Sequence, residues 1–120
     1  MKALIVEDSR SIKMVLADAL QPLGLTAVLA DNGLLALEAL KDTSEFKVII
    51  TDLNMPEMDG RQLISSIRAS EKHRNTPIIV LSGRGTAQDI EAIKKLQIQG
   101  WIVKKQFDRA RLQKLVRSLL

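Results

Sequence analysis

Short apolar runs alternate with amphipathic helical patterns five times along the chain, and this alternation restricts the fold more than any other feature. The apolar runs are rich in Val, Ile and Leu, as buried strands are, and turn-forming residues follow them. Each run precedes a segment whose apolar residues recur three and four positions apart, as they do on one face of a helix. We therefore expect strands at 2–6, 25–30, 47–51, 77–81 and 100–103, and helices at 10–21, 33–41, 61–70, 86–97 and 108–119.

Strands that alternate with helices predict an α/β fold in which a parallel sheet is covered on both faces. The chain has 120 residues, of which 46% are hydrophobic, enough for one core but not for two ordinary domains. We expect one domain over residues 1–120, a (βα)5 flavodoxin-like three-layer sandwich whose five-stranded parallel sheet has the order 2-1-3-4-5. In this order the first and third strands are neighbours, at the point where such sheets bind their ligands.

Acidic residues end these two strands. The apolar run before Asp52 is β-branched and suits a central strand, and the first strand stops at Glu7 and Asp8. A lone acid in such a place usually caps a turn or a helix, and Asp8 and Ser9 are both N-cap candidates for the next helix. Three carboxylates at one edge of a sheet, however, repel one another unless a cation lies among them or one is protonated. Oxygen ligands without His or Cys suit Mg²⁺.

Composition excludes several classes of function. The chain has no cysteine, which excludes disulfides, thiolate metal sites and a cysteine nucleophile. Its one histidine, His73, lies in a polar run, where we expect a solvated loop residue and no Ser-His-Asp triad. No apolar stretch approaches the roughly 20 residues of a membrane span, and residues 1–2 lead directly into a strand instead of a signal peptide. We expect a cytoplasmic protein with no membrane partner.

The chain as a whole resembles the receiver domains of bacterial two-component response regulators, close to the chemotaxis-type stand-alone regulators. The resemblance rests on Glu7-Asp8, on the segment AspLeuAsnMetProGluMetAspGly at 52–60, on Ser82 after the fourth strand, and on the pair Trp101 and Lys104 after the fifth. Each motif by itself is weak. Together they occur in order, each at the carboxyl end of its strand, and this combination is specific.

The resemblance implies that Asp52 accepts a phosphoryl group from a sensor histidine kinase or a histidine phosphotransfer protein in a phosphorelay. It also implies that Mg²⁺ binds directly to Asp8, to Asp52 and to the backbone carbonyl of Asn54, with Glu7 acting through water. The expected protein is a phosphoacceptor that assists its own phosphoryl transfer and dephosphorylation, and not an enzyme with a separate substrate.

Two further residues would contact the phosphoryl oxygens by the same resemblance, Lys104 through its ammonium and Ser82 through its hydroxyl. Each would be an ordinary surface or helix-start residue if it stood alone. The phosphoryl group would draw in Ser82, move the loop at 83–85 and let Trp101 swing inward, although a lone Trp near a strand is usually core. The output surface would be the helix at 86–97 with the strand and helix that follow it.

Several positions depart from the family pattern or need a local explanation. Glu7 stands where the family more often has Asp, and Trp101 replaces a smaller Tyr or Phe. Lys105 stands where the family usually has a proline with a cis bond, so the Lys104–Lys105 bond is either trans with a rebuilt loop or strained. Thr86 and Asp89 resemble a capping box at the start of the fourth helix.

Basic residues gather near the end of the chain. Residues 94–120 hold eight Lys or Arg against one acid, a net charge of +7, whereas residues 1–93 have a net charge of −3. A solvated face is the usual explanation of such a run, but a charge of +7 here is enough to favour an acidic protein partner by electrostatic steering. Nucleic acid is a weaker option because the chain has only three aromatic residues and no basic-aromatic interleaving. For oligomeric state we expect a monomer or a phosphorylation-dependent dimer.

Three classes of function are consistent with these patterns, and a phosphorylatable signalling switch is favoured. A phosphohydrolase with an aspartyl-phosphate intermediate would need a general acid two residues after the nucleophile, where this chain has Asn54. A phosphorylation-independent interaction domain that keeps only the receiver fold is the remaining alternative, and the changed segment at Lys104–Lys105 permits it.

Overall fold

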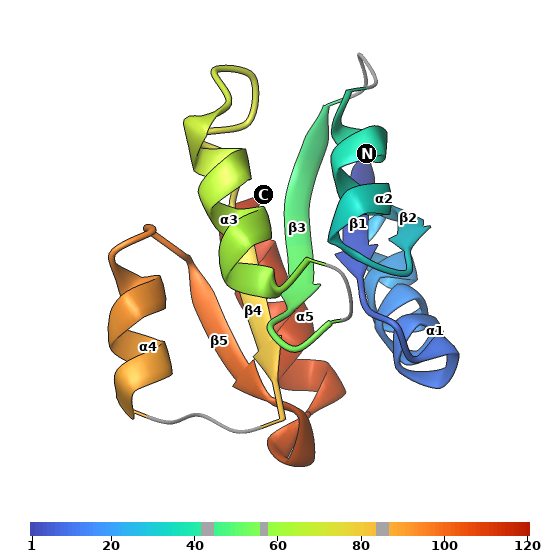
Figure 1. Cartoon of the computed structure of the whole chain (residues 1–120). Helices are drawn as coiled ribbons and strands as arrows, with labels where there is room; N and C mark the ends of the chain where they lie inside the picture. The colour runs from blue at the N-terminus through green and yellow to red at the C-terminus, as the bar shows by residue number, and fades with distance from the viewer. Residues whose placement is uncertain (42–44, 56–57, 84–86) are drawn as a thin grey trace.

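The computed structural model describes residues 1–41, 45–55, 58–83 and 87–120, with side chains described outside 84–90. Within them, strands and helices alternate as predicted (Figure 1). The strands are β1 (Lys2–Val6), β2 (Thr26–Ala30), β3 (Phe46–Asp52), β4 (Ile78–Ser82) and β5 (Gly100–Val103), and the helices are α1 (Arg10–Leu20), α2 (Gly33–Leu40), α3 (Gly60–Ala69), α4 (Ala87–Lys94) and α5 (Arg109–Leu119). Two 3-10 turns, η1 (Gln21–Leu23) and η2 (Lys104–Gln106), follow α1 and β5. None of the helices described is long and apolar enough to cross a membrane.

The strands form one parallel sheet in the order β2-β1-β3-β4-β5, which confirms the predicted topology. β1 lies between β2 and β3 and pairs with both, and its last residue, Val6, lies opposite Ala30 of β2 and Thr51 of β3. The residues that follow Val6 and Thr51 therefore meet at the carboxyl edge of the sheet. This is where the chain places its acidic residues.

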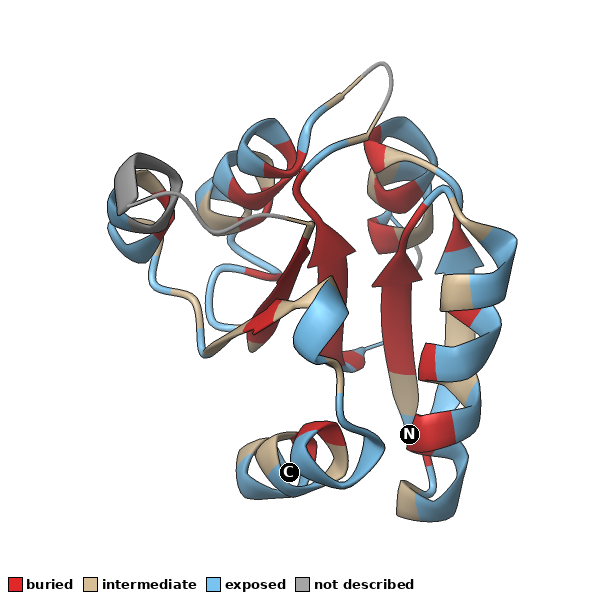
Figure 2. Ribbon diagram, turned by 90° about the horizontal axis from the view of Figure 1, so that it is seen from below, coloured by how far each residue is buried: buried red, intermediate tan, exposed pale blue. Residues whose placement is uncertain are grey.

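Two apolar clusters, one on each face of the sheet, hold the three layers together. Successive strand residues point to opposite faces, so Leu4 belongs to the cluster beneath α2, α3 and α4, and Ile5 to the cluster beneath α1 and α5. Figure 1 shows α2 and α3 in front of the sheet and α5 behind it. Figure 2 shows the central strands buried along their length and the helices buried on the side turned to the sheet. Burying each such Leu or Ile contributes about 1.5–3 kcal/mol.

Side-chain caps fix where the helices begin. Ser9 is the N-cap of α1, where its hydroxyl accepts from the Ile12 amide at 3.3 Å. Asp59 and Gln62 form a full capping box at the start of α3. Each cap accepts a hydrogen bond from an amide that has no acceptor within the helix, and such a cap is worth about 1 kcal/mol. The capping box predicted at Thr86 and Asp89 lies outside the residues whose side chains are described.

The fourth helix is shorter than predicted. The periodic pattern predicted a helix to residue 97, but α4 ends at Lys94, and the chain turns through hydrogen bonds from the Leu96 amide to the Ile93 carbonyl (2.8 Å) and from the Gln97 amide to the Lys94 carbonyl (3.1 Å). Gln97 adopts a left-handed conformation with φ of 58°. This conformation ends helices and is usually taken by glycine, which the sequence does not have there.

His73 is buried, and the prediction of a solvated loop residue was wrong. Only 4% of it is exposed, its Nε2 lies 2.9 Å from the Leu40 carbonyl oxygen at the end of α2, and its ring is 6.5 Å from that of Phe46. The polar neighbours of His73 in sequence correctly indicate a turn. They carry no information on the carbonyl and the aromatic ring that other segments bring to it.

Candidate functional site

Three carboxylates meet at the carboxyl edge of the sheet. Glu7 and Asp8 follow β1, and Asp52 ends the neighbouring β3. One oxygen from each of them lies within 4.8 Å of the others, and no other group of three metal-binding side chains occurs in the described part of the chain. Glu7 and Asp52 are buried, whereas Asp8 is exposed and could be reached from solvent.

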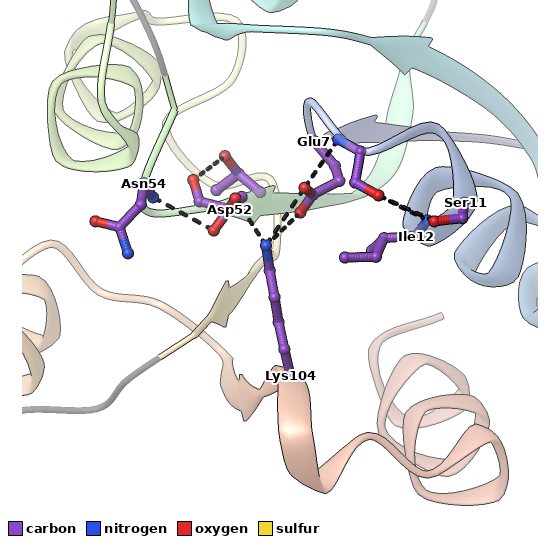
Figure 3. Close-up of polar contacts among 8 residues, drawn as sticks. Glu7, Ser11, Ile12, Asp52, Asn54 and Lys104 are labelled. Carbon is purple, nitrogen blue, oxygen red and sulfur yellow. Dashed lines mark hydrogen bonds and ion pairs between the residues drawn. The ribbon is translucent and has the colours of Figure 1, made fainter.

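Lys104 neutralises part of this negative charge. Its Nζ lies 3.0 Å from Asp52 Oδ2, to which it donates a hydrogen bond, and 3.1 Å from Glu7 Oε2 (Figure 3). The lysine side chain is 25% exposed and the two carboxylate side chains at most 2%, so these ion pairs form in a poorly hydrated place where charges interact strongly. Lys104 therefore bridges two strands that are adjacent in the sheet.

The segment that carries Lys104 has a trans backbone. The described residues contain no cis peptide bond, so of the two alternatives predicted for the Lys104–Lys105 bond the structure has the trans one. The loop is rebuilt as η2, in which the Phe107 amide donates to the Lys104 carbonyl at 3.3 Å. The lysine ammonium reaches the carboxylates from this loop without the proline that the family pattern has.

Burial sets the proton affinity of Glu7. Desolvation raises the pKa of Glu7 to about 7 from an ordinary 4.5, and the nearby Asp8 and Asp52 carboxylates add to the shift. The Ser9 amide, 3.1 Å from Oε1, and the Lys104 ammonium act in the opposite direction without cancelling it. The Lys104 ammonium is thus insufficient to keep Glu7 fully ionised at neutral pH.

The proton affinity of Lys104 changes for a related reason. Burial by itself lowers the pKa of Lys104, but the hydrogen bonds and charges of Asp52 and Glu7 outweigh burial, so the net shift is upward. Lys104 is therefore held in its charged form. A charged ammonium at this edge can contact any anion that enters the site.

Backbone contacts fix the position of Asp52. The Asn54 amide donates to Asp52 Oδ1 at 3.3 Å, and the Thr51 hydroxyl donates to the Asp52 carbonyl at 3.0 Å. A Cβ on Gly60 would lie 2.5 Å from the Asp52 carbonyl oxygen and 2.7 Å from Leu53 Cα, so only glycine permits this close approach. The sequence indicated a turn at Gly60, but not its support of the Asp52 loop.

Ser82 lies on β4, the strand next to Asp52, and Trp101 lies on β5, one strand farther out. Ser82 is buried at the end of β4, one residue beyond Leu81, which pairs with Asp52. Trp101 is half-buried on β5 and packs against the cluster beneath α2, α3 and α4, with an indole nitrogen that is buried and has no hydrogen-bond partner among the described residues. The structure thus brings Glu7, Asp8, Asp52 and Lys104 together and places Ser82 at the same edge. Trp101 lies near the start of β5, away from this edge, and of the loop at 83–85 only Gly83 is described.

The raised pKa of Glu7 predicts a pH dependence of stability in the metal-free protein. The folded state keeps the Glu7 proton up to about pH 7, whereas the unfolded chain loses it near pH 4.5, so the free energy of unfolding should fall as pH rises through this window. Glu7→Gln removes the titrating group and should flatten that part of the profile. Urea unfolding in EDTA over the window measures the slope, with Glu38→Gln on the exposed side of α2 as the control. A Glu7→Gln profile as steep as that of the wild type would contradict the prediction.

Comparisons with known proteins agree with this geometry. The chemotaxis protein CheY homolog of Campylobacter jejuni is 36% identical over 105 residues, which cover 87% of this chain and 81% of that protein. The solved structure of the chemotaxis protein CheY4 of Vibrio cholerae has a TM-score of 0.89 at 32% identity, covering 99% of this chain and 98% of that one.

A second solved structure bears on metal binding. It is the receiver domain of a sensor histidine kinase from Pseudomonas aeruginosa, with a magnesium ion coordinated in its active-site cleft; its TM-score is 0.86 at 28% identity, covering 98% of this chain and 95% of that one. The family model described as the response regulator receiver domain matches residues 3–117. The chain therefore belongs to the response regulator receiver domain family.

Proposed function

We propose that this chain is a signalling switch that accepts a phosphoryl group on Asp52. The observation that carries this proposal is the position of the Asp52 carboxylate, which is held at the end of β3 within hydrogen-bonding distance of Lys104 and next to two further carboxylates. A structural ion pair would need one carboxylate for one lysine. Three acids around one ammonium instead suit a site that takes up another cation and an anion together.

The three carboxylates fit Mg²⁺, as hard oxygen donors close enough to share one ion. Asp8, Asp52 and the backbone carbonyl of Asn54 would hold the ion directly, and Glu7 would act through water. When bound, Mg²⁺ supplies positive charge that neutralises the phosphoryl oxygens. The remaining chemistry is that of the chain's own side chains.

The transfer itself is a displacement at phosphorus. An oxygen of Asp52 attacks the phosphorus of a phosphohistidine, the O–P bond of an acyl phosphate forms, the N–P bond breaks, and the donor imidazole leaves with the electron pair. Lys104, which contacts Asp52 Oδ2 at 3.0 Å, would move its hydrogen bond to a phosphoryl oxygen. Ser82, at the same edge of the sheet, would contact a second phosphoryl oxygen through its hydroxyl.

The chain acts on itself in this proposal and has no separate substrate. Asn54, two residues after the nucleophile, lacks the carboxyl proton that a phosphohydrolase would donate. The alternative, an interaction domain that works without phosphorylation, drew support from Lys105 in place of proline. The Lys104 ammonium nevertheless reaches Asp52 and Glu7, and this contact favours the phosphorylated switch.

The proposed switch needs two kinds of partner, a donor of the phosphoryl group and a protein that responds to phosphorylation. A sensor histidine kinase or a histidine phosphotransfer protein would donate the phosphoryl group. The output partner would bind the surface formed by α4, β5 and α5, where α5 exposes four basic residues: Arg109, Arg111, Lys114 and Arg117. An acidic protein suits this surface, and the charge would affect the rate of encounter more than the final affinity.

Asp52→Asn should abolish phosphorylation, because the amide keeps the shape of the side chain but is no nucleophile. Wild-type protein incubated with phosphoramidate and Mg²⁺ should gain the mass of one phosphoryl group, and the variant should gain none. Asp18→Asn, at an exposed position on α1 that pairs with Arg109, is the matched control and should react as the wild type does. A phosphoryl adduct on the Asp52→Asn protein would assign the acceptor to another residue.

Mg²⁺ should raise the melting temperature in a concentration-dependent way, because an ion that binds only the folded state stabilises it. Asp8→Ala should weaken Mg²⁺ affinity by about tenfold or more, since the loss of a residue that only hydrogen-bonds a metal ligand already weakens metal binding by about this factor. Glu38→Ala on α2 controls for the loss of one negative charge. Equal Mg²⁺ affinities for wild type and Asp8→Ala, by calorimetry or thermal shift, would argue against the site.

Phosphorylation should change the solvent exposure of Trp101, the chain's single tryptophan, through Ser82. The expected coupling is about 1–3 kcal/mol, so the response should be graded. Acrylamide quenching with and without beryllofluoride measures it, and Ser82→Ala should bind beryllofluoride yet show a reduced change. A Ser82→Ala protein with the full wild-type response would remove Ser82 from the switching route.

A further inference from the structure

Arg68, in the last turn of α3, ties together two loops at the end of the sheet opposite Asp52. Its guanidinium donates to acceptors in the α4–β5 loop, namely the carbonyls of Leu96 (2.9 Å) and Gln97 (2.8 Å) and the side-chain oxygen of Gln99 (3.2 Å). It also donates to carbonyls of the α3–β4 loop, those of Arg74 (3.0 Å) and Thr76 (2.8 Å). These contacts use all five N–H groups of the planar guanidinium fork.

The turn that Arg68 holds is strained. Gln97 has a φ of 58°, a left-handed conformation that a side chain with a Cβ disfavours. Its carbonyl oxygen accepts from Arg68 and, at 3.1 Å, from the side-chain nitrogen of Gln99. A strained conformation persists only where the surrounding contacts fix it, and Arg68 and Gln99 supply such contacts.

The same contacts reach the start of the last two strands. The Gln99 amide donates to the Ile78 carbonyl at 2.8 Å, and the Ile78 amide donates to the Gln99 side-chain oxygen at 2.7 Å. These bonds set the register in which Ile79 pairs with Gly100, and Trp101 is the next residue on β5. Arg68, through Gln99, thus bears on the position of the strand that carries Trp101.

α4 is anchored at this end. Ile93, in the last turn of α4, is fully buried, and the Leu96 amide donates to its carbonyl, so this turn leads directly into the contacts of Arg68. At the other end, a Cβ on Gly83 would have no atom of the described residues within 4 Å. Figure 1 shows that the end of α4 leads to the start of β5, whereas the start of α4 lies towards the carboxyl edge of the sheet, where β4 ends.

We propose that Arg68 is a positioning residue for the output surface. Its guanidinium fixes the α4–β5 corner, defined as residues 94–99, in both states of the switch, so that α4 responds to the phosphoryl group by pivoting about this corner and not by shifting as a whole. The part that concerns the response rests on the proposed function. The part that concerns the corner can be tested without phosphorylation.

The first test is amide hydrogen exchange by NMR in the unphosphorylated protein. Arg68→Lys keeps the charge but loses the fork that spans both loops, and the Gln99 and Ile78 amides should exchange about tenfold faster relative to the Leu4 and Ile5 amides of β1. The reference amides separate local opening from a general loss of stability. Arg111→Lys, at an exposed position on α5, is the control. Corner amides of Arg68→Lys within about twofold of wild type would overturn the proposal.

A second variant tests the reason for the effect. Glycine adopts the left-handed conformation without strain, so Gln97→Gly added to Arg68→Lys should restore much of the lost protection at Gln99 and Ile78. A merely structural role for Arg68, such as filling space, would not be rescued by a glycine in another loop. A double variant as open as Arg68→Lys alone would overturn the claim that Arg68 acts by holding this turn.

The third test compares wild type and Arg68→Lys with Mg²⁺ and beryllofluoride. In the wild type, amide shifts should appear at Glu91, Ala92 and Trp101, while Gln97 and Gln99 keep their protection; in Arg68→Lys the shifts should extend through the corner. A wild-type corner that loses protection on activation would overturn the pivot. Absence of any shift near Asp52 would refute the proposed function alone, because the first two tests still decide the role of Arg68.

Discussion

The contacts of Lys104 hold together the part of the structure on which the site depends. Glu7 and Asp52 are buried side by side at the ends of β1 and β3, and two buried carboxylates repel each other unless a cation lies between them. Lys104 supplies that cation from η2, after a strand that is separated from β3 by β4. One ammonium thus joins the edge of the sheet to its centre, and removing one partner of a buried ion pair typically costs about 3–5 kcal/mol.

The same arrangement leaves the charges of the site only partly balanced. Burial raises the pKa of Glu7 to about 7 and repulsion from Asp52 adds to the shift, and neither the Lys104 ammonium nor the Ser9 amide cancels it. A second cation would relieve this repulsion and free the lysine to contact an incoming anion. Under the proposed function, the electrostatic energy of the site falls when metal and phosphoryl group arrive together, which a purely structural ion pair would not do.

Local sequence patterns predicted the strands and the acids at their ends, because periodicity and strand ends are local properties, and the strand order followed from the order common in such folds. Asp52 and Glu7 could be placed together since each directly follows an apolar run in a parallel sheet. The contacts that sequence could not predict join distant segments: His73 to Leu40, Gly60 to the Asp52 backbone, and Arg68 to residues 28 to 31 positions later. The early end of α4 could not be predicted either, because Arg68 holds the left-handed turn at Gln97 and the sequence has no glycine there to indicate it.

The size of these interactions limits how the switch can move. A phosphoryl group shifts an equilibrium only by its differential contacts, typically about 1–3 kcal/mol. A hydrogen bond from a charged group is worth about 1.5–3 kcal/mol, so breaking even two of the contacts of Arg68 would use all of that coupling. Under the proposed function, the rearrangement that phosphorylation can drive is then one that leaves the corner at 94–99 intact and changes the other end of α4. In this proposal, a corner held by Arg68 confines the effect of a small energy at Asp52 to one defined surface.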